Sequence, residues 1–202
     1  MKNQFDVEAA HWDKQQYRLR RTKRFAEAIK DSLPLKKNFK GLDFGCGTGL
    51  LGFNFLDTIN HMTFWDSSEG MIEQVNNKIT DNSRAIGQIC DIFTVSPAER
   101  FDLIVTLQAL HHVPDAYGAV KILSEMTMPG GYLCLADLVE EDGSFHGEHL
   151  ETAHNGFNVA DLESHLNGLG LEKVSTTYPF INEKVIDGEK KQFPLFLLIY
   201  KK

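Results

Sequence analysis

The stretch KGLDFGCGTGLLG, residues 40–52, decides how the rest of the sequence is interpreted. Its apolar LDF segment has the character of a buried strand, and alternating glycines follow at once. Glycine tolerates positive φ and carries no side chain, so a ligand can approach the backbone closely at Gly45, Gly47 and Gly49. The stretch therefore predicts a strand that ends in a tight turn open to a ligand.

A helix start is expected directly after this turn. Thr48 is a suitable N-cap residue, and residues 50–56 are expected to continue the helix. The unpaired N–H groups at a helix start attract polar or negatively charged ligand atoms. The turn is therefore expected to cradle a nucleotide.

The kind of nucleotide depends on one acid. The glycines at 47, 49 and 52 also fit the dinucleotide pattern G-x-G-x-x-G, which is a weak signal by itself. Asp43, two residues before the first glycine, is expected to place its carboxylate beside the ligand. That charge would repel a pyrophosphate but attract the sulfonium and ammonium groups of S-adenosylmethionine.

The segment DFGCGTG, residues 43–49, resembles the D-x-G-x-G-x-G motif of class I S-adenosylmethionine-dependent methyltransferases, of the broad ubiquinone/menaquinone-biosynthesis-like group (methyltransferase domain 11/25 type). The resemblance implies S-adenosylmethionine as cofactor, S-adenosylhomocysteine as product, and methyl transfer by direct displacement. Two other functions stay open at this point: an NAD(P)-dependent oxidoreductase, and a protein that binds the cofactor without turnover.

Apolar segments and helical segments alternate along most of the chain, which favours a parallel sheet with helices on both faces. No helical period separates the last two strands, so these are expected to pair antiparallel. The fold class is thus α/β, a Rossmann-like, seven-stranded, mostly parallel sheet with a C-terminal antiparallel hairpin. Strands are expected near residues 40–44, 62–66, 84–90, 101–107, 132–138, 171–180 and 193–200, and helices within 1–33 and near 50–56, 67–79, 114–126 and 159–168.

The first three strands each end in an acid, at Asp43, Asp66 and Asp91. Ligands of open α/β sheets bind beyond the carboxyl ends of the strands, where these acids would gather. Asp66 follows Gly47 by 19 residues, close to the spacing of an acid that binds ribose hydroxyls. The alternative role for Asp66 is to cap the next helix.

The resemblance assigns further residues to the cofactor. Ser67 and Met71 would border the adenosine, although Met71 could equally be ordinary core packing. The adenine edge and the methionine moiety would be met by residues after the third and fourth strands. The full predicted cofactor set is Asp43, Gly45, Cys46, Gly47, Gly49, Asp66, Ser67, Met71, Asp91, Ile92, Leu107 and Gln108.

No catalytic residue is identified from the sequence, and the weak candidates are His111, His112 and Tyr17. The two histidines belong to LHHVPD, which is similar to the family's motif after the fourth strand. Either could act as a base for the acceptor, or could hold the loop through a backbone hydrogen bond. We favour the structural role for both, because adjacent residues on a turn rarely face the same pocket.

The loop at 140–157 is expected to form a lid or acceptor loop. Its histidines, His146, His149 and His154, with Asp142 and Glu148 as spare ligands, match no zinc spacing, so no metal is expected. Glycines would supply flexibility. The side chains proposed to cover the acceptor are Phe145, His146 and Phe157 here, and Trp12 and Tyr17 near the N-terminus.

Length and composition limit the remaining possibilities. The 202 residues fit one domain, with an N-terminal helical cap at 1–33, a cofactor-binding core at 40–138 and a terminal hairpin at 171–200. A net charge of −7 disfavours nucleic acid as partner despite the basic run RLRRTKR at 18–24. A small-molecule methyl acceptor is expected. Three widely spaced cysteines and no long apolar span favour a cytoplasmic protein without a membrane span, and the oligomeric state stays open.

Overall fold

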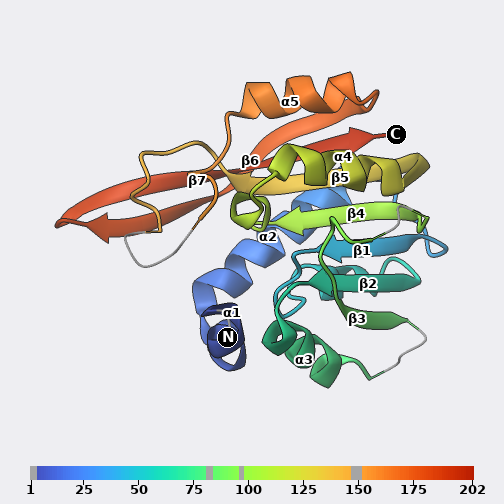
Figure 1. The fold of residues 1–202 in the computed structure, drawn as a ribbon, viewed down its shortest axis with the longest axis horizontal. Coiled ribbons are helices and arrows are strands. Elements are labelled where there is room, and N and C mark those ends of the chain that lie inside the picture. The colour runs from blue at the N-terminus through green and yellow to red at the C-terminus, as the bar shows by residue number, and fades with distance from the viewer. Residues whose placement is uncertain (1–3, 81–83, 96–97, 147–151) are drawn as a thin grey trace.

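The computed structural model describes residues 4–80, 84–95, 98–146 and 152–202. Its centre is a seven-stranded sheet in the order β3-β2-β1-β4-β5-β7-β6 (Figure 1). The strands are β1 Lys40–Phe44, β2 His61–Asp66, β3 Ala85–Ile89, β4 Phe101–Leu107, β5 Thr127–Leu138, β6 Glu172–Ile186 and β7 Glu189–Lys201.

Strand direction follows the predicted pattern. β1 pairs parallel with β2 and β4, and β4 pairs parallel with β5. β7 enters antiparallel between β5 and β6. The predicted fold class, a mostly parallel sheet that ends in an antiparallel hairpin, is therefore confirmed.

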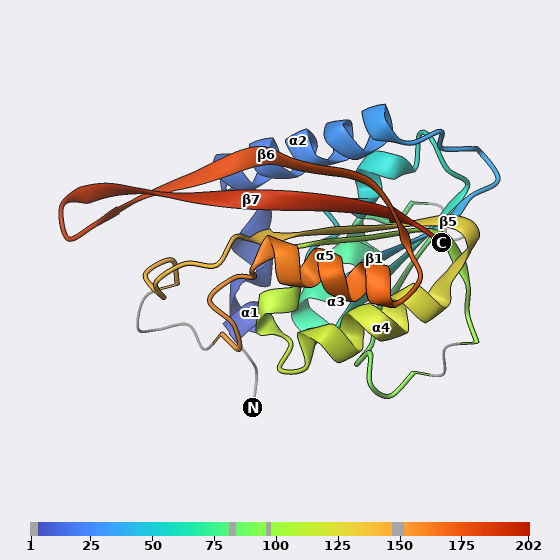
Figure 2. The same cartoon turned by 90° about the horizontal axis from the view of Figure 1, so that it is seen from above.

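Helices cover both faces of the sheet, and α2 lies opposite α4 and α5 (Figure 2). Helix α2 buries Phe25, Ala26 and Ile29 in the core that also receives α3, because residues four apart share one helix face. The opposite core receives α4 and α5. The helical elements are α1 Gln4–Glu8, η1 Ala9–Lys14, α2 Gln16–Ser32, η2 Gly52–Phe55, α3 Glu69–Lys78, η3 Leu110–His112, α4 Ala116–Met126 and α5 Val159–Gly168, where η marks a 3-10 helix.

The helix predicted at 50–56 is wrong. Only the short 3-10 helix η2 forms there, and the hydroxyl of Thr48 donates to Asp13 Oδ1 instead of capping a helix. Glycine at position 52 disfavours a helix, and its N–H is held by Asp43 Oδ2 at 2.8 Å. The expected role of a helix start in binding the nucleotide is thus lost.

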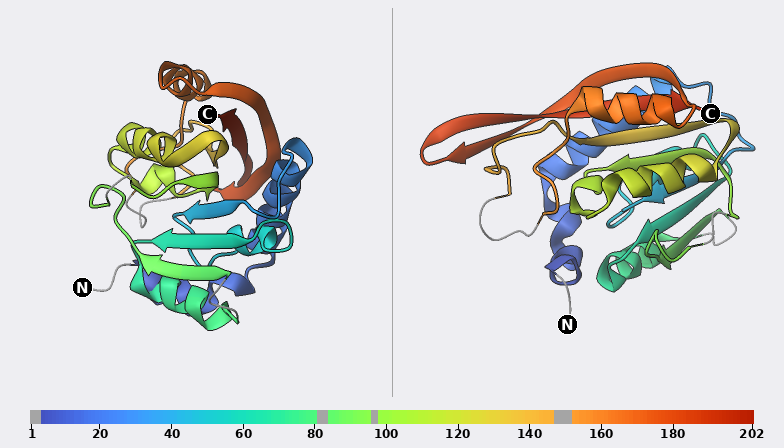
Figure 3. Two further views of the ribbon diagram at one scale, coloured as in Figure 1. Left: turned by 90° about the vertical axis from the view of Figure 1, so that its right-hand side faces the viewer. Right: turned by 45° about the horizontal axis from the view of Figure 1, so that its top comes forward.

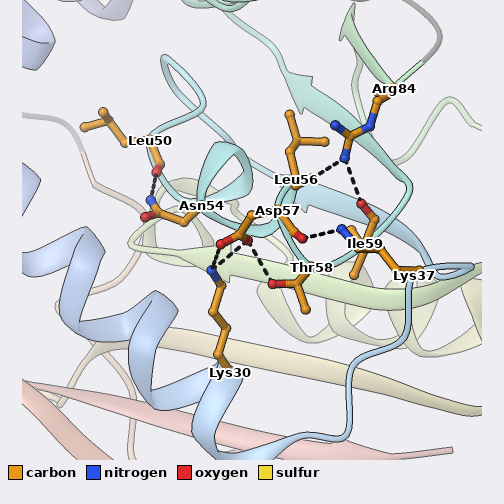
Figure 4. Close-up of polar contacts among 9 residues, drawn as sticks. All are labelled: Lys30, Lys37, Leu50, Asn54, Leu56, Asp57, Thr58, Ile59 and Arg84. Atoms are coloured by element: carbon orange, nitrogen blue, oxygen red, sulfur yellow. Dashed lines mark hydrogen bonds and ion pairs between the residues drawn. The ribbon is translucent and has the colours of Figure 1, made fainter.

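Polar side chains stabilise the segment that replaces this helix (Figure 4). Lys30 Nζ donates to Asp57 Oδ1 at 2.8 Å, and Arg84 Nη2 donates to the carbonyl groups of Leu56 and Ile59. The Arg84 contacts satisfy two backbone carbonyl groups that would otherwise lack a partner from the protein chain. Side chains, rather than the hydrogen bonds of a long helix, therefore stabilise the segment that follows η2.

The terminal hairpin is longer than predicted. β6 runs on to Ile186, β7 begins at Glu189, and both strands project beyond the rest of the sheet (Figure 1). Asp187 and Gly188 have φ of 52° and 81°, which is the left-handed geometry of a two-residue hairpin turn. The Asp-Gly pair in the sequence is a strong signal for such a turn, and the sequence analysis missed it.

Among the described residues, no helix is both long and apolar enough to cross a bilayer. The helices predicted within 1–33 form as α1, η1 and α2. Part of the predicted lid, residues 147–151, lies outside the described residues.

Candidate active site

A cavity of about 1630 Å³ lies at the carboxyl ends of the central strands. Every predicted cofactor residue except Gly49 lines it. Gly49 instead serves the turn: its φ is 82°, and an added Cβ would lie 2.7 Å from the ring of Phe53. The carboxyl ends of the parallel strands therefore bring Asp43, Asp66 and Asp91 to one cavity, as the sequence predicted.

Asp43 lines this cavity but is 1% exposed. Burial raises its pKa to about 8, and nearby Asp66 adds to the rise. The carboxyl group is therefore mostly protonated at neutral pH in the ligand-free protein, whereas the sequence argument assumed a negative charge. A cationic ligand would favour its ionisation.

Asp66 connects the end of β2 to the glycine turn. Its Oδ2 accepts from the N–H of Gly47 at 2.7 Å and its Oδ1 from the N–H of Ser68 at 2.9 Å. Ser68, rather than Asp66, caps α3 through its hydroxyl, which accepts from the N–H of Met71. Each Asp66 oxygen keeps a second lone pair, so the carboxylate can still accept from a ribose hydroxyl.

The remaining predicted cofactor residues fit an adenosine ligand that carries an amino acid. Met71 and Ile92 are buried apolar residues on the cavity wall, suited to an adenine ring. Gln108 follows β4 with φ of 53°, and its Oε1 is buried without a hydrogen-bond partner. A buried acceptor with no donor is what an ammonium group would satisfy. The residues present therefore fit S-adenosylmethionine.

The N-terminal segment closes one side of the cavity. Asp13 accepts from Thr48 Oγ1 and from Lys78 Nζ, both at 2.5 Å, and Trp12 lies beside the glycine turn. Asp6 accepts from Ser68 Oγ at 2.6 Å. Sequence analysis predicted Trp12 as a cover but missed both acids, because nothing local pairs residues so far apart in the chain.

His111 is held by Asp137 at the end of β5. His111 Nδ1 lies 2.6 Å from Asp137 Oδ1, and the backbone N–H of His111 donates to Asp137 Oδ2 at 3.2 Å. Both residues are buried, and His111 Nε2 has no hydrogen-bond partner. The sequence analysis missed Asp137, although the rule that singled out acids at strand ends would have found it.

The two adjacent histidines both line the cavity, so the reason given for a purely structural role does not hold. The ring of His111 lies 4.1 Å from that of His112 and 4.8 Å from that of His146, between centroids. Burial, followed by the two neighbouring histidines, lowers the pKa of His146 to about 3. His146 is therefore neutral, and it covers His111.

The other residues predicted to cover the acceptor differ in whether they line the cavity. Phe145 and Tyr17 line the cavity with Trp12 and His146. Phe157 does not: it forms a bridge with Val139 and is buried in the core against α4 and α5. No group of metal ligands occurs within the described part of the chain, while His149 and Glu148 lie outside it.

Comparisons with known proteins agree with this geometry. Residues 42–133 match the family model of a methyltransferase domain. The chain is 27% identical over 179 residues to 27-O-demethylrifamycin SV methyltransferase of Amycolatopsis mediterranei, covering 82% of this chain and 66% of that protein. It is 33% identical over 94 residues to ubiquinone biosynthesis O-methyltransferase of Coxiella burnetii, covering 46% of this chain and 40% of that one. The chain therefore spans less than two thirds of either relative.

The fold has close counterparts among solved structures. A chain from the complex between the Haloferax volcanii Trm112 methyltransferase activator and a methyltransferase superposes with a TM-score of 0.78 at 15% identity, covering 100% of this chain and 98% of that one. At this identity the similarity concerns the fold alone.

Proposed function

Because this chain is a class I S-adenosylmethionine-dependent methyltransferase, we propose that it methylates a hydroxyl group of a small molecule, with His111 as general base. Membership of this family argues against the alternative of an NAD(P)-dependent oxidoreductase. It also favours methyl transfer over a protein that binds the cofactor without turnover. The observation that carries the proposal is the buried pair of His111 and Asp137, of which His111 lines the cavity.

The pair determines which nitrogen of His111 can accept a proton. An ionised carboxylate only accepts hydrogen bonds, so Nδ1 of the neutral ring must carry the proton that is shared with Asp137. Asp137 is held in turn by the N–H of Leu138 at 2.7 Å. The lone pair of His111 is therefore on Nε2, the atom without a partner. A buried carboxylate also stabilises the imidazolium that forms when Nε2 takes a proton.

A base of this kind is most useful to a hydroxyl acceptor. Bound S-adenosylmethionine supplies an activated methyl group, so the chain has only to bind, align and deprotonate the acceptor. An unprotonated amine attacks with its free lone pair, and a thiol ionises close to neutral pH, whereas an alcohol or phenol must lose its proton as the new bond forms. The names of both curated relatives specify O-methylation, which supports this choice for the present chain.

The surroundings of His111 favour a small acceptor. His146 covers the His111 ring, and Phe145 lies 4.6 Å from His146 between ring centroids. The N-terminal segment closes the cofactor side through Asp13. These contacts limit the access of water and of large substrates to the reacting groups.

The proposal is tested by binding and turnover measured separately. Calorimetry with S-adenosylhomocysteine measures the cofactor site, and formation of S-adenosylhomocysteine from S-adenosylmethionine across matched phenols, amines and thiols measures transfer. We expect turnover with a phenol or alcohol. His111→Gln and Asp137→Asn should lower kcat by roughly 10²- to 10⁴-fold with little change in cofactor affinity.

His165→Gln is the matched control, because His165 lies on α5 with Nε2 directed to the carbonyl of Tyr117, outside the cavity. It should keep normal turnover. Wild-type kcat in His111→Gln, or turnover confined to amines and thiols, would refute the assignment.

A further inference from the structure

The basic run at 18–24 lies on α2, and part of it forms a wall of the cavity. Most of its charges are already engaged. Arg18 stacks 3.4 Å above the ring centroid of Trp12 and pairs with Glu8 at 3.5 Å, while Lys23 and Arg24 each approach Glu27 at 3.9 Å. Part of the run is nevertheless turned toward the cavity.

Arg21 differs from these neighbours. Within the described part of the chain it has no carboxylate at ion-pair distance, and its closest ring contact is Tyr17, 5.7 Å from the guanidinium carbon to the ring centroid. The Arg21 side chain is half-buried, but its Nε is shut off from solvent without a hydrogen-bond partner. Burial lowers the pKa of Arg21 to about 10, in the direction expected for a cation that is withdrawn from water.

A second donor without a partner faces the same cavity. Asn182 on β6 is 6% exposed, lines the cavity, and has a buried Nδ2 with nothing to donate to. Helix α2 packs beside β6 (Figures 2 and 3), so both donors belong to one wall. Two buried donors without acceptors are unfavourable unless a ligand supplies the acceptors.

The nature of that ligand follows from charge. Both orphaned atoms are donors, and one belongs to a permanent cation, so a neutral carbonyl would satisfy the hydrogen bonds but leave the charge unpaired. A carboxylate or a phosphate satisfies both requirements, and guanidinium groups bind these anions well.

Arg21 and Asn182 lie away from the residues predicted to bind the nucleoside. The predicted nucleoside contacts follow β1, β2 and β3, whereas Asn182 is on β6 at the opposite edge of the sheet. Arg21 and His111 line the same cavity. An acceptor could therefore contact His111 and Arg21 together.

We propose that the methyl acceptor carries a carboxylate or phosphate group, which Arg21 and Asn182 bind while His111 faces the hydroxyl to be methylated. The proposal rests on the proposed function, and it narrows the acceptor to a hydroxylated organic acid or phosphate ester.

The test observes the orphaned atom directly. The side-chain Nε–H signal of Arg21 is followed by ¹⁵N NMR in the protein saturated with S-adenosylhomocysteine, and Arg21→Lys identifies the signal by its loss. Benzoate, phenyl phosphate and the neutral benzamide are then titrated to about 50 mM, enough to saturate a millimolar site. We expect the signal to move with benzoate or phenyl phosphate and not with benzamide. The anion that binds with the higher affinity indicates whether the acceptor carries a carboxylate or a phosphate.

Matched variants complete the experiment. Asn182→Asp keeps the shape, replaces the donor with oxygen, and should weaken anion binding at least about tenfold. Arg100→Gln removes an arginine outside the cavity and should leave it unchanged. Arg21→Lys should retain cofactor affinity.

Three results would overturn the proposal. One is the absence of any anion-dependent shift, and another is an equal shift with benzamide. The third is a shift completed by S-adenosylhomocysteine alone, which would assign Arg21 to the cofactor's own carboxylate. Failure of the protein to bind S-adenosylhomocysteine would instead contradict the proposed function.

Discussion

Replacing Asp43 with asparagine is expected to flatten the pH dependence of folding stability between about pH 5 and pH 8. The pKa of this carboxyl is raised to about 8 in the folded chain, against 3.8 for the ordinary group. Between these two pH values the unfolded chain has lost the proton and the folded chain keeps it, so the folded state binds more protons and stability falls as pH rises. Asparagine does not titrate, so the variant lacks this loss.

The size of the effect follows from the pKa difference. Each pH unit in the interval changes the free energy of unfolding by about 1.36 kcal/mol for one proton. From about pH 5.5 to about pH 7.5, wild type should lose roughly 2.7 kcal/mol relative to Asp43→Asn. For a chain of 202 residues this is a Tm difference that grows by roughly 5–11 °C across the interval. The asparagine oxygen can still accept from the N–H of Gly52.

The assay is thermal or urea unfolding of ligand-free protein at several pH values. Asp57→Asn is the control: Asp57 is exposed, and its hydrogen bond with Lys30 lowers its pKa, so its titration lies below the interval. The control should differ from wild type by a constant amount. Parallel curves for Asp43→Asn and wild type would refute the reasoning about the buried carboxyl.

Other substitutions probe the turn and its cover. Asp66→Ala should weaken S-adenosylhomocysteine binding at least about tenfold by calorimetry, because the acceptor of ribose and of the Gly47 N–H is lost, and unchanged affinity would contradict the ribose assignment. Gly45→Ala should lower Tm by several degrees, since the new Cβ would lie 2.2 Å from that of Ala109 at a φ of 62°, whereas Gly168→Ala, with open space around its Cβ, should keep or raise Tm. Asp13→Ala should speed tryptic cleavage of the N-terminal segment by removing its contacts with the core, and an unchanged cleavage rate would show that these contacts do not hold it.

The strands, their parallel or antiparallel directions, and the gathering of most predicted cofactor residues at one cavity could be predicted from the sequence, because each depends on a local signal. Alternation of apolar and helical segments predicts a parallel sheet, and the carboxyl ends of parallel strands meet at one edge. That rule predicts that Asp43, Asp66 and Asp91 lie together, and all three line one cavity. The same rule applied to β5 would have added Asp137.

Only the tertiary structure decided what depends on environment and on contacts between distant segments. The charge state of Asp43 depends on burial, which no local pattern reports. The pairing of Asp13 with Thr48, and the placement of Arg21 and Asn182 along one cavity, arise because packing brings segments far apart in the chain together. A sequence specifies which side chains can donate, accept or ionise, but their partners and solvent exposure, and hence their charge and chemistry, are set when the chain folds.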